Sequence, residues 1–151
     1  MKSIIFVCLG NICRSPLAEG IARNLNDKHQ LGLTVASAGT GDWHIGQAPC
    51  PHSIKVAKQH QIDISNFKGQ QVTQDDFTNF DLVVGLDDSN ISNLKKLGCK
   101  NVLKLGDFGF EGEDVPDPYF FDGFEGFDKV FDMIETSVYN LLKSHLPASD
   151  L

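Results

Sequence analysis

Hydrophobic positions follow two spacings along this chain, and together they predict strands that alternate with helices. Short apolar runs are typical of buried strands, and they span 4–7, 33–38, 81–86 and 102–105. Apolar residues three and four positions apart are typical of helices, and they mark 16–28, 51–61, 73–80, the segment from 91 to Gly98, and 127–142. We therefore expect one α/β domain over 1–151, with a parallel sheet, right-handed crossovers and the first strand at its centre.

Capping residues predict where several of these elements begin. Ser15 is placed to cap the first helix, with Pro16 at its first helical position. Thr73 and Asp76 predict a box-like helix start, and the polar run 87–90 caps the helix that follows it. Two long loops remain, over 39–51 and 106–122. The second is longer than a simple connection requires, which favours a functional role.

The stretch from Cys8 to Ser15 carries the candidate chemistry. It joins the first strand directly to a helix, so several backbone N–H groups point into one concavity and the helix dipole adds positive charge. The helix terminus and the Arg14 guanidinium both favour a thiolate at Cys8. The planar guanidinium of Arg14 can hold two oxygens of one phosphate. A nucleophile and an oxyanion clamp that face one bound anion predict a phosphoryl-transfer site.

The context of Cys8 matters, because a cysteine at a strand end is usually just a small buried residue. Here a glycine lies two positions later, and the loop leads straight into a helix that a proline opens. A Walker phosphate loop does not fit, since no Gly-Lys-Ser/Thr sequence follows. The pattern therefore favours a cysteine nucleophile over both alternatives.

Composition narrows the function classes. The 151 residues carry a formal net charge of −7, which argues against nucleic-acid binding. No apolar run approaches membrane length and no signal peptide is recognisable, so we expect no membrane association and a cytoplasmic setting. The cysteines form no disulfide framework and no Cys-x-x-Cys motif, and the histidines are scattered. We expect reduced thiols, no metal and no cofactor.

The segment Val7–Pro16 resembles the signature of the low molecular weight protein tyrosine phosphatase family, which carries it at the same place near the N-terminus. The resemblance runs from Ile4 to the final helix. It implies a single-domain three-layer sandwich, with a four-stranded parallel sheet in the order 2-1-3-4 and helices on both faces. It also implies that the phosphate-binding loop follows the first strand.

Asp117 is the candidate general acid, in Val-Pro-Asp-Pro-Tyr within the second long loop. Flanking prolines stiffen the backbone around this short carboxylate. Asp-Pro is also a common turn dipeptide, so the residues alone leave both interpretations open. The resemblance favours the acid, because Asp-Pro-Tyr in a late loop is the general-acid motif of that family. Since Asp117 must begin protonated, we expect the reaction to prefer mildly acidic pH.

The resemblance implies hydrolysis of phosphotyrosine in proteins in two steps. Cys8 forms a cysteinyl phosphate, Arg14 and the loop N–H groups hold the oxygens, and Asp117 acts as acid and then as base. Ser15 can donate to the Cys8 thiolate, and Ser37 is expected to support the shape of the loop together with Asn11. The expected phosphate- and substrate-binding residues are Leu9, Gly10, Asn11, Ile12, Cys13, Ser15, Trp43 and Tyr119.

Cys13 has a second expected role, as the redox partner of Cys8. A thiol five residues from a reactive thiolate can trap its sulfenic acid as a disulfide, which would switch activity off reversibly. The alternative is that Cys13 only packs beneath the loop.

Three other functions share parts of this pattern. An arginine phosphatase on this fold carries threonine where this chain has Ile12, and the isoleucine favours phosphotyrosine. A thioredoxin-coupled arsenate reductase needs two further cysteines in one mobile segment, whereas Cys50 and Cys99 are far apart in sequence. A non-catalytic phosphotyrosine-binding module would normally lack the nucleophile or the acid, and both are present here.

The chain also departs from the family pattern. Cys50-Pro51-His52-Ser53 stands where many relatives have Asp-Pro-Arg, and Phe67 and Gln70 replace residues that are commonly basic. These changes affect surface contacts with substrate and leave the chemistry untouched. The expected partners are phosphotyrosine-containing proteins, a tyrosine kinase or its substrates, and the expected state is a monomer, with weak dimerisation as the alternative.

Overall fold

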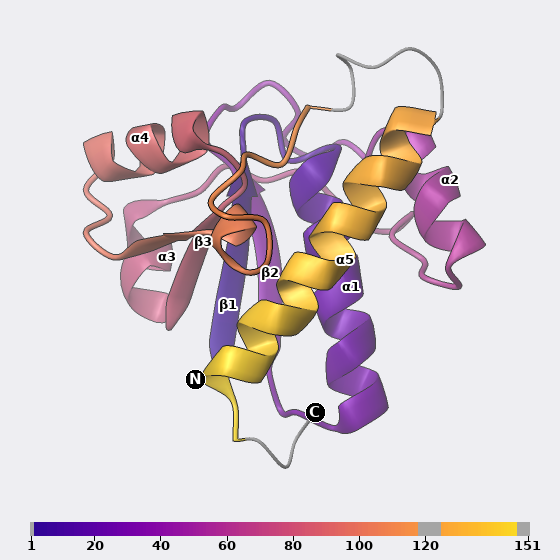
Figure 1. Cartoon of the computed structure of the whole chain (residues 1–151). Coiled ribbons are helices and arrows are strands. Elements are labelled where there is room, and N and C mark those ends of the chain that lie inside the picture. The colour runs from indigo at the N-terminus through magenta and orange to yellow at the C-terminus, as the bar shows by residue number, and fades with distance from the viewer. Residues whose placement is uncertain (1, 118–124, 148–151) are drawn as a thin grey trace.

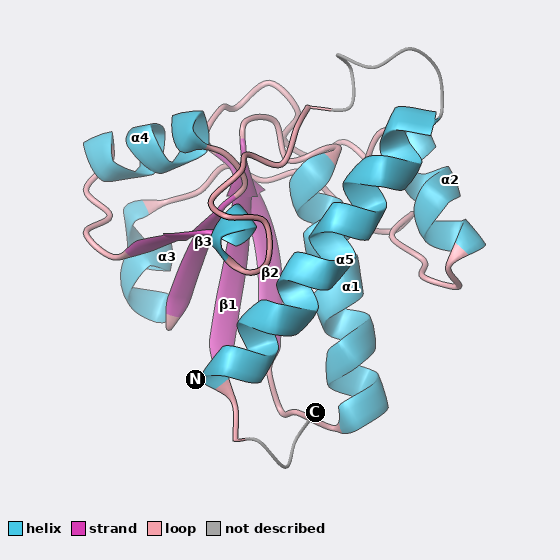
Figure 2. Ribbon diagram, in the orientation of Figure 1, coloured by secondary structure: helices cyan, strands magenta, loops and turns pink. Residues whose placement is uncertain are grey.

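Four parallel strands form one sheet in the order β2-β1-β3-β4 (Figure 2). The strands are β1 (Ser3–Cys8), β2 (Thr34–Gly39), β3 (Leu82–Gly85) and β4 (Val102–Lys104). The structure is a computed structural model and describes residues 2–117 and 125–147. The expected strand order and parallel direction are confirmed.

Strand β1 lies at the centre of the sheet because its side chains are apolar on both faces. Ile4, Ile5, Phe6 and Val7 are all fully buried. In the register, Cys8 lies opposite Gly39 of β2, and the residue before it lies opposite the last residue of β3. Cys8 is therefore at the carboxyl edge of the sheet, where open α/β sheets bind their ligands.

Helices cover both faces of the sheet. Helices α1 (Arg14–His29), α2 (Pro51–Gln59) and α5 (Glu125–His145) pack on the face that carries Ile4 and Phe6. Figure 1 shows α5, in yellow, crossing this face beside α1. The short helix α3 (Gln74–Asn79) and helix α4 (Asp88–Lys96) pack on the other face, against Ile5 and Val7. Successive side chains of β1 point to opposite faces of the sheet, so this one strand contributes to the hydrophobic core on each face.

Several predicted boundaries are correct. Helix α3 follows Thr73, whose backbone N–H donates to the Asp76 carboxylate at 2.8 Å. Helix α4 follows Asp87, whose carboxylate accepts from the Asn90 backbone N–H at 2.7 Å. Each cap satisfies a backbone group that the helix itself leaves unpaired.

The predicted cap of the first helix is wrong. Helix α1 begins at Arg14 and its N-cap is Cys13, which makes no side-chain cap hydrogen bond. Ser15 lies inside the first turn because its hydroxyl is engaged by Cys8 and Asn11 instead of the helix backbone. Pro16 still lies in the first turn, where its missing N–H removes no helical hydrogen bond.

Other boundaries differ from the prediction by a few residues, and two of them have a clear local cause. The last strand ends at Lys104, because Leu105–Asp107 turns into a single 3₁₀ turn, η1. Helix α2 ends at Gln59, and the chain leaves it through Gln61, which has a positive φ of 62°. No helix within 2–117 and 125–147 combines the length and apolar character that crossing a membrane requires.

Candidate active site

The loop from Cys8 to Cys13 lies between the carboxyl end of β1 and the start of α1. Backbone bonds hold it against the end of β2: Thr40 N–H donates to the Cys8 carbonyl at 2.9 Å, and Gly41 N–H donates to the Leu9 carbonyl at 2.9 Å. A Cβ at Gly39 would lie 2.8 Å from the Leu9 carbonyl oxygen. Glycine at position 39 therefore allows the two segments to approach this closely.

Asn11 is the structural centre of the loop. Its φ of 57° is left-handed, a conformation that asparagine tolerates better than most residues. Its amide Nδ2 donates to Ser15 Oγ at 2.8 Å and to Ser37 Oγ at 3.0 Å, and its Oδ1 accepts from the Gln70 backbone N–H at 3.0 Å. Three separate segments thus hold one buried side chain, and this arrangement fixes the shape of the loop.

The Cys8 sulfur faces two donors. Ser15 Oγ lies 3.0 Å from Cys8 Sγ, and the Asn11 backbone N–H donates to the same sulfur at 3.3 Å. Because Asn11 already donates to Ser15 Oγ, the serine proton is left to donate, and Cys8 Sγ is closer than the Ala38 carbonyl at 3.5 Å. Both donors stabilise negative charge on the sulfur.

The sequence did not point to Glu19, which extends this network. Ser37 Oγ donates to Glu19 Oε1 at 2.6 Å, and Arg23 Nε donates to Glu19 Oε2 at 2.6 Å. Glu19 is only 7% exposed, so its charge needs these partners. Since Ser37 gives its proton to Glu19, its oxygen is left to accept from Asn11. Glu19 and Arg23 are four residues apart on α1, a spacing that could have suggested the pair but not its link to Ser37.

Arg14 is buried and held from two distant segments. Its Nη1 donates to Asp87 Oδ2 at 2.7 Å and to the Val115 carbonyl at 2.9 Å. Burial by itself would lower the pKa of Arg14, but the neighbouring Cys8, Asp87 and Asp117 raise it above its ordinary value. The sequence indicated Asp87 only as a helix cap. In the structure its Oδ1 caps α4 while its Oδ2 holds Arg14.

The segment before Asp117 is tied to the sheet by charge and by backbone. Lys104 Nζ contacts both Asp114 and Asp88 at 2.8 Å, and Asp114 also accepts from the Asp88 backbone N–H at 2.9 Å. The Lys104 ammonium holds the pKa of Asp114 below its ordinary value. Val115 is fully buried, and its N–H donates to the Leu86 carbonyl at 2.8 Å. These ties place Asp117 two residues from an anchored backbone.

A pocket of about 200 Å³ opens over the loop. Its lining brings together most of the predicted site: Cys8, Leu9, Gly10, Ile12, Cys13, Arg14, Trp43, His44 and Asp117. His44 was not predicted, and no sequence signal distinguishes it from the other scattered histidines. Trp43 is 63% exposed, so it forms a rim of the pocket and not part of the core.

Other predicted residues lie elsewhere. Asn11, Ser15 and Ser37 are buried and belong to the network that supports the loop, and none of them lines the pocket. Tyr119 lies outside the described residues, so its predicted contact with substrate is not placed. Within the described ranges, no group of three or more His, Cys, Asp or Glu residues could hold a metal ion.

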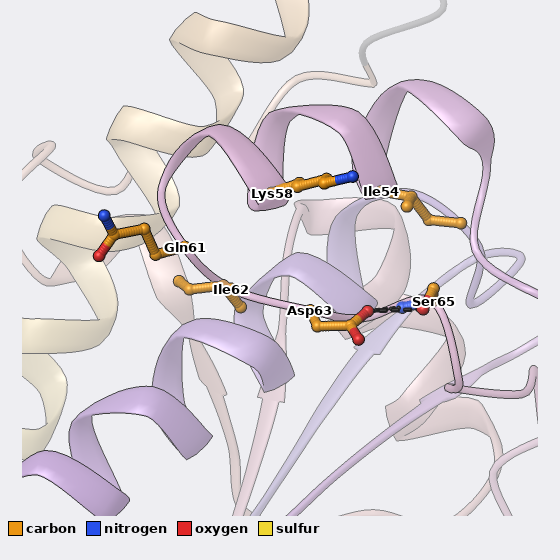
Figure 3. A pocket seen from close by; sticks show the side chains of 6 residues that line it. All are labelled: Ile54, Lys58, Gln61, Ile62, Asp63 and Ser65. Atoms are coloured by element: carbon orange, nitrogen blue, oxygen red, sulfur yellow. Dashed lines mark hydrogen bonds between the residues drawn. The ribbon is translucent and has the colours of Figure 1, made fainter.

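A second pocket, of about 300 Å³, lies beside α2 and shares no residue with the first (Figure 3). In Figure 3 the carboxylate of Asp63 points toward Ser65, whose hydroxyl and backbone N–H both donate to it, at 2.6 and 2.8 Å. Both bonds lower the pKa of Asp63. The residues that line this pocket include no cysteine, and its charged side chains are exposed, so the candidate chemistry belongs to the first pocket.

The chain resembles known proteins over almost its whole length. The family model described as "Low molecular weight phosphotyrosine protein phosphatase" matches residues 3–148. The low molecular weight protein-tyrosine-phosphatase PtpA of Staphylococcus aureus (strain MRSA252) is 39% identical over 147 residues, which are 94% of this chain and 92% of that protein.

Solved structures agree with the sequence similarity. A protein tyrosine phosphatase from Entamoeba histolytica, solved with Hepes in its active site, has a TM-score of 0.87 and 34% identity, over 96% of this chain and 97% of the other. The drosophila arginine phosphatase DARP has a TM-score of 0.87 and 32% identity, over 97% and 99% of the two chains. Relatives with two different named substrates therefore share this fold at similar identity.

Proposed function

Because the chain belongs to the low molecular weight phosphotyrosine protein phosphatase family, whose members are cysteine-dependent phosphatases, we propose that it hydrolyses phosphotyrosine in proteins through Cys8, Arg14 and Asp117. One observation carries the proposal: these three side chains line the same pocket although they come from segments up to 109 positions apart in the sequence, 117 minus 8. A nucleophile, a cation and a carboxylate at one small opening are the groups that phosphate-ester cleavage needs.

In the first step, the Cys8 thiolate attacks phosphorus and the bond to the tyrosyl oxygen breaks. Asp117 gives its proton to that oxygen, so tyrosine leaves as a neutral phenol. Arg14 and the backbone N–H groups of the loop stabilise the charge on the three remaining oxygens. The Ser15 and Asn11 donors hold the sulfur in place before substrate arrives.

In the second step, water attacks the cysteinyl phosphate. Asp117, now a carboxylate, takes a proton from the water, the sulfur–phosphorus bond breaks, and Cys8 leaves as a thiolate. The Ser15 hydroxyl, 3.0 Å from the sulfur, stabilises the departing charge. The cycle ends with inorganic phosphate and an unchanged enzyme, because the proton taken from water leaves Asp117 protonated for the next turnover.

Apolar groups around the pocket support phosphotyrosine as the substrate. Leu9 is 44% exposed and Trp43 is 63% exposed, and both line the opening above Cys8. Exposed apolar walls can contact an aromatic ring while the phosphate reaches the loop. Ile12 also lines the pocket, and its side chain occupies space that a phosphoguanidinium group would need. Phosphoarginine is therefore the second candidate substrate and phosphotyrosine the first.

The test is turnover of phosphotyrosine and phosphoarginine peptides by the wild type and by Cys8→Ser. We expect phosphotyrosine turnover without added metal, and a loss of about a thousandfold or more in Cys8→Ser. Faster turnover of phosphoarginine would overturn the substrate assignment and leave the nucleophile in place. Thioredoxin-dependent reduction of arsenate without phosphatase activity would overturn the proposed reaction itself.

The proposal extends to the setting. A tyrosine kinase or its substrates are the proposed partners, a reducing cytoplasm is the proposed location, and a monomer is the proposed state, with weak dimerisation as its alternative. Cys13 lines the pocket that contains Cys8, which supports the proposal that it traps oxidised Cys8 as a disulfide. Sedimentation of the purified protein over a range of concentrations tests the oligomeric state.

A further inference from the structure

Cys13 and Cys50 lie against one another, although 37 positions separate them in the sequence. Cys13 Sγ lies 2.7 Å from Cys50 Sγ. Both cysteines are N-caps, Cys13 of α1 and Cys50 of α2, and neither helix receives a side-chain cap bond from them. The thiols are therefore directed at each other and not at the helix ends.

The surrounding bonds hold the two segments together. Cys50 N–H donates to the Ile12 carbonyl at 2.7 Å, and Ser53 Oγ donates to the Cys13 carbonyl at 3.2 Å while lying 3.0 Å from Cys50 Sγ. Ser53 is fully buried. Because the two sulfurs are already 2.7 Å apart and a disulfide places them about 2.0 Å apart, a covalent bond between them needs little movement of the chain.

The two thiols differ in their access to the pocket. All three cysteines are buried, but Cys13 and Cys8 line the pocket and Cys50 does not. Cys13 thus contacts Cys50 and shares the pocket with Cys8. A small oxidant that enters the pocket can reach both Cys8 and Cys13, and the Cys8 thiolate of the proposed function is the group that reacts with it. Cys50 does not line the pocket, so its route to the oxidised sulfur runs through Cys13.

We propose that Cys50 is a resolving thiol, which takes over the oxidation of Cys8 through Cys13 and leaves a Cys13–Cys50 disulfide. The inference rests on Cys8 being the reactive thiolate of the proposed function. It adds a site that neither the loop sequence nor the proposed Cys8–Cys13 bridge contains.

The sequence of steps balances with hydrogen peroxide as the oxidant. The Cys8 thiolate attacks one peroxide oxygen, the O–O bond breaks, and Cys8 becomes a sulfenic acid while water leaves. Cys13 attacks the Cys8 sulfur and expels a second water, which gives a Cys8–Cys13 disulfide. The Cys50 thiolate then attacks Cys13 Sγ and expels the Cys8 thiolate. Two thiols have lost two electrons, and one peroxide has become two waters.

The consequence is that one equivalent of oxidant leaves the nucleophile reduced. In a two-cysteine bridge, the disulfide itself blocks Cys8 until a reductant opens it. With Cys50 as the final partner, Cys8 returns to the thiolate form and the oxidation is stored beside the pocket. This chain therefore tolerates an oxidant pulse that would inactivate a variant without Cys50.

Peptide mapping after peroxide treatment tests the proposal. Trypsin places Cys8 and Cys13 together in the peptide 3–14 and Cys50 in the peptide 29–55. The fully reduced protein is treated with one equivalent of peroxide, blocked with an alkylating reagent at low pH, and digested. We expect a cross-linked pair of these peptides in which fragmentation finds the alkyl group on Cys8. A loop within 3–14, with Cys50 alkylated, would overturn the proposal.

Activity assays with two serine variants provide the matched control. Serine is a preferred N-cap residue, so Cys50→Ser keeps the helix start and the basal phosphatase activity. We expect it to lose activity roughly tenfold faster than the wild type at the same peroxide dose, because the last exchange step is missing. Cys99 is buried against the other face of the sheet, and Cys99→Ser should behave like the wild type.

These readouts separate the inference from the proposed function. If neither the wild type nor Cys50→Ser has phosphatase activity before oxidation, the proposed function fails, and the peptide map still reports which thiols pair. If both proteins are active and lose activity at the same rate, the role of Cys50 is wrong while the phosphatase remains.

Discussion

The loop from Cys8 to Cys13 and the segment that carries Asp117 meet at one pocket, but they are held in different ways. The loop is fixed by a dense network of short hydrogen bonds around the buried Asn11. The segment around Asp117 is tied by Lys104 and Asp114, by the Val115 backbone, and by Arg14. Hydrogen bonds to Asn11 preorganise the first region, whereas charges and backbone groups of other segments, from Lys104, Leu86 and Arg14, position the second.

This difference matters for the proposed function, in which the two halves of the site have different roles. The nucleophile needs a sulfur and a set of oxygen-binding groups held at fixed distances, which a buried network supplies. The acid must reach the leaving group of a large substrate. A segment that is anchored only at Asp114 and Val115, just before Asp117, is sufficient for that. Arg14 joins the halves, since it belongs to α1 and donates to the Val115 carbonyl. Changes at the acid should therefore depend on the substrate, and changes at the loop should not.

The largest expected effect follows from Asp117→Asn, which keeps the shape of the side chain and removes the acid. We expect kcat on phosphotyrosine peptides to fall by about 10²–10⁴. The loss should be much smaller for an aryl phosphate whose leaving group is a weak base, because that group departs without a proton. Stopped-flow or steady-state assays on a series of aryl phosphates measure the dependence. Equal losses across the series would show that Asp117 is not the acid.

The next effect tests the link between the two halves. Asp87→Asn keeps a good N-cap for α4 but weakens the charged hydrogen bond to Arg14. A hydrogen bond to a charged group contributes about 1.5–3 kcal/mol, so we expect kcat/KM to fall by about 10- to 100-fold. The matched control is Asp88→Asn, whose side chain is 78% exposed and contacts Lys104 instead. If both variants lose activity equally, the Arg14–Asp87 pair has no special role.

A smaller effect is expected within the loop network. Ser37→Ala removes two hydrogen bonds, the one that Ser37 accepts from Asn11 and the one that it donates to Glu19. Only the bond from Asn11 reaches the loop, and one such bond contributes about 0.5–1.5 kcal/mol, so kcat should fall about 2- to 10-fold, by a similar factor for every leaving group. Ser65→Ala, beside the second pocket, removes an exposed serine and should leave kcat unchanged. A loss in Ser37→Ala that depends on the leaving group would contradict the division between the two regions.

The sequence predicted the parts of the site whose information is local. Cys8 and Arg14 lie in one short loop, and Asp117 stands out because prolines flank it. The sheet order followed from the resemblance, and the alternating pattern agreed with it. These residues are recognisable from their neighbours in the sequence, so the sequence pattern is sufficient to predict them.

The partners that fold across the sheet could not be predicted. Asp87 has the signature of a helix cap, and nothing along the chain pairs it with Arg14, 73 positions away. Ser15 has the residue type of a cap, but the loop takes its hydroxyl instead. Cys50 is a departure from the family pattern at a loop end, and only the packing of α2 against α1 places it beside Cys13. Each case depends on which segments the fold brings together, and residue spacing does not specify that.

The smallest expected effect concerns the charged tie of the acid segment. Lys104→Met removes the ammonium that contacts Asp114 and Asp88. Because Asp114 is half exposed, the loss of stability at pH 7 should be only about 1 kcal/mol. Since Lys104 lowers the pKa of Asp114, the tie is present above the ordinary carboxyl pKa of about 4 and is lost as pH falls through the lowered value. Burial opposes the charged form of Lys104, but Asp114 and Asp88 raise its pKa, so the tie also persists up to alkaline pH.

Thermal unfolding of the wild type and of Lys104→Met, from about pH 3 to about pH 8, measures this effect on both sides of the carboxyl pKa. We expect the difference in Tm to be constant near neutrality and to close below about pH 4. Lys100→Met, an exposed lysine just before β4, is the control and should show no such pH dependence. In Lys104→Met, the rate of Cys8 alkylation should stay at the wild-type value while kcat falls a few-fold, because only the segment that carries Asp117 is loosened. A Tm difference that persists unchanged at low pH would mean that Lys104 acts through packing of its aliphatic stem, and the acid segment would then need another anchor.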